Sequence, residues 1–206
     1  MTRHSFTRLL GRCFCFVALL VAFAASSHAQ VAPHSGDAGF NAGVNNAGSL
    51  QSNGTVSSTA FSYGGSAGYN LSENISVLGE FQYIPEGSFD KVSANTQLYG
   101  GLMRYSFGRG RVAPYVLVGG GGSRGSLGTS GLSVSVNGGY VGFGGGASVF
   151  LGKNWGIRPE FRYNDVFFSA AGTTSSAGMY QATGGVFFQF GGESKSAKHE
   201  VASAQQ

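Results

Sequence analysis

The heptapeptide IRPEFRY, residues 157–163, alternates strictly between two kinds of side chain. Its odd-numbered positions are apolar or aromatic, and its even-numbered positions are charged. A period of two predicts a β-strand whose two faces meet different surroundings. In a soluble sheet the apolar face would pack inward and the charged face would meet water. The rest of the chain has to decide whether that default holds here.

The first 29 residues are interpreted as a secretory signal peptide. Arg3, Arg8 and Arg12 precede an uncharged run over residues 13–25, and small residues follow it up to Ala29. The run is shorter than the roughly 20 apolar residues that a spanning helix needs, which favours cleavage after Ala29 over a membrane anchor. Export of the chain beyond the inner membrane is therefore expected.

Removing residues 1–29 changes the composition of the chain. Both cysteines leave with the signal peptide, so the mature chain is expected to hold no disulfide. Ten basic residues remain against nine acidic ones, which lowers the formal charge from +4 to +1. This balance gives no reason to expect nucleic acid as a partner. The remaining 177 or so residues suit one domain.

Charged residues make up 11% of the chain, against about 25% in ordinary soluble domains. Segments with a period of two recur along it, separated by short and long connections in turn. The short connections are LSEN (71–74), GRGR (108–111) and LGKN (151–154), and the long ones lie around 49–57, 85–95, 123–131 and 169–177. The predicted strands are 38–48, 58–70, 75–84, 96–107, 113–122, 132–150, 155–168 and 178–190. A strand of about ten residues can cross a bilayer when tilted, and such alternation of connections is typical of outer-membrane barrels.

Two strands of this set have weak or irregular patterns. The first, DAGFNAGVNNAG, has only Phe40 and Val44 as sizeable apolar residues. In the sixth strand the alternation slips between Val136 and Val141, which predicts a bulge near residues 137–139. Pro159 lacks a backbone donor, so a bulge or a water-bound carbonyl is expected opposite it.

Aromatic residues gather where the predicted strands end, which predicts two girdles at the membrane interfaces. Beside the short connections stand Tyr69, Phe107, Tyr115, Phe150, Trp155 and Phe190. At the opposite strand ends stand Phe61, Tyr83, Tyr99, Phe167 and Tyr180.

Three segments resemble the small eight-stranded outer-membrane barrels, of the outer-membrane protein A transmembrane domain and outer-membrane protein X type. They are RPEFRY (158–163), GYNLSENISVLGEFQY (68–83) and MYQATGGVFFQF (179–190). The resemblance implies an all-β fold over residues 36–190, an eight-stranded antiparallel up-and-down transmembrane β-barrel surrounded by outer-membrane lipids. It also implies recognition of the last strand by the barrel-assembly machinery. The residues that would carry this assembly signal are Tyr180, Val186, Phe188 and Phe190.

Residues 191–206 continue past this signal. Their composition predicts a disordered polar tail. Sixteen residues are too few for the peptidoglycan-binding domain of the larger relatives.

In a barrel surrounded by lipid the two faces exchange roles, and polar side chains point into the lumen. Five charged residues are predicted to form a lumen charge network: Glu80, Arg104, Arg158, Glu160 and Arg162. Arginine suits this position because it keeps its charge when buried and bridges several acceptors. Two carboxylates against three guanidiniums leave one positive charge, which Gln82, Asn164, Asp165 or water would have to meet.

The sequence favours a structural or surface-interaction role over an enzymatic one. None of the four histidines lies on a predicted strand, whereas outer-membrane lipid A deacylases and omptin-type proteases use a barrel histidine. No Lys-Ser/Thr follows the glycine clusters, and Glu86 and Asp90 read as a solvated loop, so no cofactor or metal is expected. Side chains can fill an eight-stranded lumen. The alternative is a narrow channel for small solutes resembling the outer-membrane protein W type.

Overall fold

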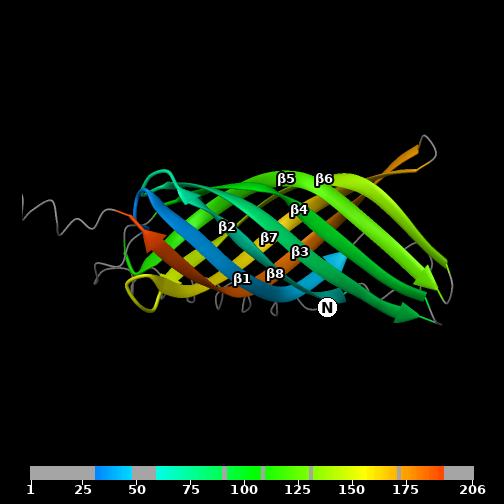
Figure 1. The fold of residues 1–206 in the computed structure, drawn as a ribbon, viewed down its shortest axis with the longest axis horizontal. Helices are drawn as coiled ribbons and strands as arrows, with labels where there is room; N and C mark the ends of the chain where they lie inside the picture. The colour runs from blue at the N-terminus through cyan, green and yellow to red at the C-terminus, as the bar shows by residue number, and fades with distance from the viewer. Residues whose placement is uncertain are drawn as a thin grey trace, which may run out of the picture.

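A computed structural model shows a closed barrel in which eight antiparallel strands pair in sequence order (Figure 1). The structure describes residues 31–47, 59–89, 92–107, 110–129, 132–170 and 173–192. The strands are β1 (Ser35–Ala47), β2 (Thr59–Asn70), β3 (Ile75–Phe89), β4 (Val92–Ser106), β5 (Val112–Thr129), β6 (Leu132–Phe150), β7 (Trp155–Ala170) and β8 (Thr173–Gly191). This confirms the predicted fold class. Within the described ranges, no helix is long and apolar enough to cross a membrane. The predicted signal peptide and nearly all of the predicted tail lie outside these ranges.

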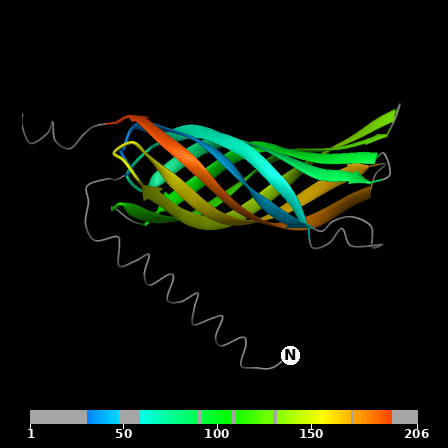
Figure 2. The same cartoon turned by 90° about the horizontal axis from the view of Figure 1, so that it is seen from below.

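The short connections gather at one end of the barrel, on the left in Figures 1 and 2, which we call the turn end. Residues 71–74 and 151–154 form two of these connections, as predicted, and the link between β4 and β5 is the third. The opposite end is called the loop end.

The predicted long connections at 85–95, 123–131 and 169–177 are wrong. In the structure the flanking strands extend into these segments and pair as hairpins. Two residues separate the end of one strand from the start of the next in each hairpin. Serine, threonine and glycine do not prevent backbone pairing, and beyond the apolar band their side chains can be solvated. Residues 48–58, which contain the remaining predicted connection, lie outside the described residues.

The first strand begins at Ser35, three residues earlier than predicted. As a result Asp37 lies within the sheet, where it pairs with Gly68 of β2 and Gln189 of β8. The outward positions beside it, Gly36 and Ala38, are small, so the sequence shows little alternation at the point where the barrel closes.

The bulge predicted near residues 137–139 is also wrong. The ladder between β5 and β6 keeps one register from Val112 paired with Val149 to Thr129 paired with Leu132. A register shift occurs instead between Pro85 and Gly87 in β3. Opposite Pro159 the β6–β7 ladder lapses and then resumes in the same register, so the missing donor is accommodated by a gap rather than a bulge.

The two faces of IRPEFRY take opposite surroundings. Phe161 is 55% exposed on the outside of the barrel, whereas Arg162 is 4% exposed in the interior. Ile157, Val186 and Phe188 likewise stand on the outer face. The soluble default is therefore inverted: the apolar face points outward and the charged face lines the lumen.

Candidate functional site

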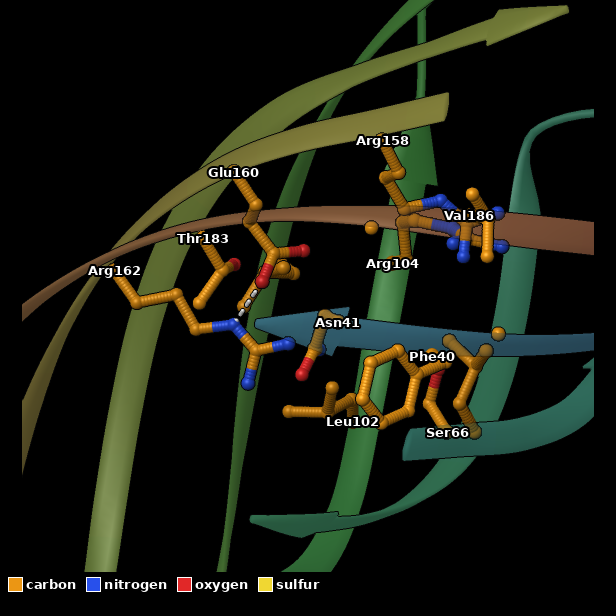
Figure 3. Close-up of a pocket in the computed structure, with 14 residues that line it drawn as sticks. Phe40, Asn41, Ser66, Leu102, Arg104, Arg158, Glu160, Arg162, Thr183 and Val186 are labelled. Atoms are coloured by element: carbon orange, nitrogen blue, oxygen red, sulfur yellow. Dashed lines mark hydrogen bonds and ion pairs between the residues drawn. The ribbon is translucent and has the colours of Figure 1, made fainter. Parts of the chain in front are cut away.

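Six charged side chains from four strands meet inside the barrel, four of which appear in Figure 3. They are Asp37 on β1, Glu80 on β3, Arg104 on β4, and Arg158, Glu160 and Arg162 on β7. The structure places all five residues that the sequence indicated in the interior, but in two ion-paired groups, with Asp37 as a sixth member. One group is Asp37, Arg104 and Arg158, and the other is Glu80, Glu160 and Arg162. With Asp37 the network holds three carboxylates and three guanidiniums, so the predicted excess of one positive charge does not arise.

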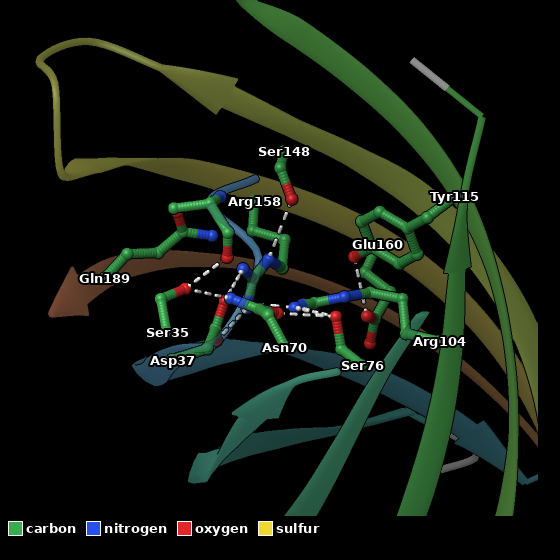
Figure 4. Close-up of polar contacts among 11 residues, drawn as sticks. Ser35, Asp37, Asn70, Ser76, Arg104, Tyr115, Ser148, Arg158, Glu160 and Gln189 are labelled. Atoms are coloured by element: carbon green, nitrogen blue, oxygen red, sulfur yellow. Dashed lines mark hydrogen bonds and ion pairs between the residues drawn. The ribbon is translucent and has the colours of Figure 1, made fainter. Parts of the chain in front are cut away.

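Asp37, with Arg104 and Arg158, forms the lower group of the network, where "lower" means nearer the turn end (Figure 4). Arg158 donates from Nη1 and Nη2 to the two oxygens of Asp37, at 3.1 and 2.8 Å. Arg104 donates from Nη2 to Oδ2 at 3.0 Å. The carboxylate is fully buried, and bidentate pairing of this kind is among the stronger charge-assisted arrangements.

A chain of hydroxyl and amide groups extends from this lower group toward β1. Arg104 Nη2 donates to Ser76 Oγ at 3.4 Å, and Ser76 Oγ donates to Asn70 Oδ1 at 2.6 Å. Asn70 Nδ2 then donates to Ser35 Oγ at 2.8 Å. These residues lie on the four adjacent strands β4, β3, β2 and β1, so the chain of hydrogen bonds connects the network to the first residue of β1 (Figure 4).

Arg162 forms the middle part of the network. Its Nη1 donates to Glu80 Oε2 at 2.5 Å, and its Nε donates to Glu160 Oε1. Two tyrosines complete the coordination of the carboxylates. Tyr140 donates to Glu80 Oε1 at 2.8 Å, and Tyr115 donates to Glu160 Oε2 at 2.7 Å. All four carboxylate oxygens therefore have a donor, which offsets the cost of burying them.

The prediction that Tyr115 and Phe150 belong to the outer girdle is wrong. Tyr115 is 2% exposed and Phe150 is fully buried, and both rings lie inside the barrel. Near the turn end both faces of the strands carry apolar residues, so alternation alone does not reveal which face an aromatic residue takes. The other four predicted members of this girdle are exposed on the outer face: Tyr69, Phe107, Trp155 and Phe190. The predicted assembly-signal residues Tyr180, Val186, Phe188 and Phe190 also point outward from β8.

Toward the loop end, three buried amides cross the lumen. Asn164 Nδ2 donates to Gln181 Oε1 at 3.4 Å, and Gln181 Nε2 donates to Gln82 Oε1. The expectation that Gln82 or Asn164 would meet a surplus charge is therefore wrong, because these amides bond through Gln181. Asp165 follows buried Asn164 in β7 and lies on the opposite, outer face, so it does not meet such a charge either.

Apolar clusters flank these polar layers. At the loop end the cluster consists of Ile84, Leu98, Tyr140, Val166 and Met179. At the turn end it consists of Val31, Ala113, Phe150 and Phe187. A third cluster, Leu78, Leu102, Tyr115 and Leu117, lies beside the charges. Along the axis the described interior thus changes from apolar to amide, to charged, and back to apolar.

A cavity of about 30 Å³ remains beside the network, lined in part by Asn41, Arg104, Glu160 and Arg162 (Figure 3). This volume suits one or two water molecules at most. Two buried atoms near it, Arg104 Nε and Asn41 Oδ1, have no protein partner. Among the described residues, no three His, Cys, Asp or Glu side chains converge as metal ligands.

A protein-family model described as "Outer membrane protein beta-barrel domain" matches residues 15–190. Among solved structures, Neisserial surface protein A superposes with a TM-score of 0.63 at 19% identity, covering 78% of this chain and 100% of that one. The N-terminal β-barrel domain of Pseudomonas aeruginosa OprF gives 0.52 at 18% identity, with the same coverage of both chains. At these identities the likeness shows the fold alone. Among curated proteins, no sequence matches significantly.

Proposed function

Because the chain belongs to the outer membrane protein β-barrel domain family, we propose that it is an integral outer-membrane protein with a structural or surface-interaction role. In this proposal the barrel is a closed anchor, the turn end faces the periplasm, and the hairpins at the loop end face the exterior. The proposal assigns the protein no catalytic activity. The barrel-assembly machinery would insert it, with the outward residues of β8 as the signal.

The observation that carries this proposal is the layered interior. Three carboxylates are balanced by three guanidiniums, a layer of amide side chains lies on their loop-end side, and apolar clusters lie at both ends. Such an interior fills the space inside an eight-stranded barrel and leaves little room for solutes. The outer face fits a lipid environment, since large apolar side chains such as Val118, Phe143 and Phe161 are exposed on it.

The hairpins at the loop end support a role at the surface. The β5–β6 hairpin continues in register beyond Ser123, and it carries the exposed side chains of Arg124 and Ser135. Arg124 Nη2 donates to Ser135 Oγ across this hairpin at 3.5 Å. Paired strands hold such side chains in fixed positions, as a recognition surface requires.

The orientation can be tested with single cysteines, because the predicted mature chain contains none. Ser135→Cys places a thiol on an exposed position of the β5–β6 hairpin, and Lys153→Cys places one on an exposed turn. On intact cells, a membrane-impermeant maleimide is expected to label the Ser135 variant and not the Lys153 variant. Both variants should be labelled after lysis. Labelling of the Lys153 variant alone on intact cells would contradict the proposed orientation.

The second candidate is a narrow channel for small solutes. It is favoured by the cavity beside the network and by the unpartnered Arg104 Nε and Asn41 Oδ1, which show that the interior is not completely packed. Conduction would require the apolar clusters at both ends to open. Reproducible single-channel steps would therefore favour this candidate over the closed anchor.

A further inference from the structure

The mouth of the barrel at the turn end is occupied by residues that precede β1. Residues 31–34, which we call the N-terminal hook, turn back toward the lumen before the chain enters the sheet. Val31 is 3% exposed and packs in the cluster with Ala113, Phe150 and Phe187. Two of these partners come from the neighbouring strands β5 and β6, and the third comes from β8. Because β5 is four strands away from β1 in the closed barrel, the side chain of Val31 reaches across the mouth.

The backbone of the hook makes a sharp turn that its contacts hold in place. His34 has a φ of 54°, in the left-handed region that residues other than glycine seldom adopt. The amide of His34 donates to the carbonyl of Asn70 at 2.8 Å. A left-handed residue of this kind persists where surrounding contacts determine its conformation. The turn thus directs Val31 back over the lumen instead of continuing the line of β1.

Both peptide groups of Ala32 are bonded to the barrel. Its carbonyl accepts from Ser35 Oγ at 2.6 Å, and its amide donates to Gln189 Oε1 at 3.4 Å. Ser35 Oγ also accepts from Asn70 Nδ2 at 2.8 Å. The hook is therefore joined to the hydroxyl and amide chain that leads to Arg104 and Asp37 (Figure 4).

The hook also meets the charge network through its apolar contacts. Phe187 lies edge-on to Phe150, with ring centroids 5.1 Å apart. The guanidinium of Arg158 lies over the ring of Phe187, 4.3 Å from its centroid. Phe187 therefore links the cluster that contains Val31 to the Arg158–Asp37 pair. Removing Val31 would leave the rings of Phe150 and Phe187 as the remaining cover of that pair on this side.

We infer that the N-terminal hook is a plug, which closes the turn-end mouth and keeps water away from the Asp37 group. This inference goes beyond the proposed function, because it concerns the opposite end from the surface hairpins. It holds whether or not those hairpins bind a partner. Val31 supplies the apolar stopper, and the hydrogen bonds of Ala32 and His34 hold it in the mouth.

Thiol accessibility tests the plug in the predicted mature chain, folded in detergent. Ser148 is 1% exposed, and it is the next inward position of β6 on the loop-end side of Phe150. The substitution Ser148→Cys replaces its hydroxyl by a thiol of similar shape. The probe is a charged methanethiosulfonate. Deleting residues 31 and 32 is expected to raise the labelling rate of this cysteine at least tenfold. Val31→Ser, which keeps the backbone contacts of the hook, is expected to raise it by a smaller factor.

Ser62→Cys is the matched control, since Ser62 is equally buried but lies toward the loop end. Its labelling rate should not change in either hook variant. The heat-induced shift on a gel shows that each variant is folded, and Val31→Ser decides the matter if the deletion variant does not fold. Unchanged labelling of Ser148→Cys would overturn the plug. An equal rise at both cysteines would also overturn it, because that result indicates a general loosening of the barrel.

Discussion

Asp37→Asn is expected to destabilise the folded barrel by about 3–5 kcal/mol, the usual cost of removing one partner from a buried ion pair. Asp37 is the carboxylate that Arg104 and Arg158 share, and it is fully buried between them. Asparagine keeps the size of the side chain and removes its charge. Two buried guanidiniums would then lie close together without a counter-charge. The measurement is the free energy of unfolding in denaturant, for protein folded in lipid vesicles.

Asp165→Asn is the matched control for this substitution. Asp165 lies on the outer face of β7, so its replacement should change the free energy of unfolding by no more than about 0.5 kcal/mol. Equal stability of the two variants would show that Asp37 does not balance the arginines. A loss confined to Asp37→Asn would support the charge-balanced interior.

Arg162→Leu is expected to cause a loss of similar size, about 3–5 kcal/mol. Arg162 is the cation that contacts both Glu80 and Glu160, and leucine leaves these two carboxylates facing each other. Glu160→Ala should cost less, about 1–3 kcal/mol, because Arg162 keeps Glu80 while Tyr115 loses its acceptor. Unfolding in denaturant compares the two variants under the same conditions.

A triple variant separates lost charge balance from lost packing. Adding Glu80→Gln and Glu160→Gln to Arg162→Leu removes all three charges of the middle group. Replacing a whole buried ion group is often neutral, so this variant should recover at least half of the stability that Arg162→Leu loses. If the triple variant is less stable than Arg162→Leu, the loss comes from packing or hydrogen bonds and not from the unpaired carboxylates.

The faces of most strands could be predicted from the sequence because one face is large and apolar. In β7 the outward residues Phe161 and Tyr163 alternate with Arg162 and Asn164, so position alone places the charges inside. The same reasoning placed Glu80 and Arg104 correctly on the inner face. In the part of β1 that carries Asp37 the outward residues are small, and the alternation that would have placed this carboxylate in the sheet is missing.

The pairing of the charges could not be predicted, because it depends on register and barrel closure. Asp37 and Arg158 are 121 residues apart, and they meet only when β1 pairs with β8 and β8 with β7. Tyr115 and Phe150 were misplaced for a different reason. Both faces of the strands are apolar near the turn end, so a girdle residue and a lumen residue look alike in the sequence.

Single-channel recording across a planar bilayer shows whether the balanced charges and the apolar clusters close the lumen. The same sample should show a heat-induced gel shift, which proves that the barrel is folded. With a closed lumen, the folded protein is expected to insert and to give no reproducible conductance steps. Reproducible steps from the folded, unmodified protein would contradict a closed lumen.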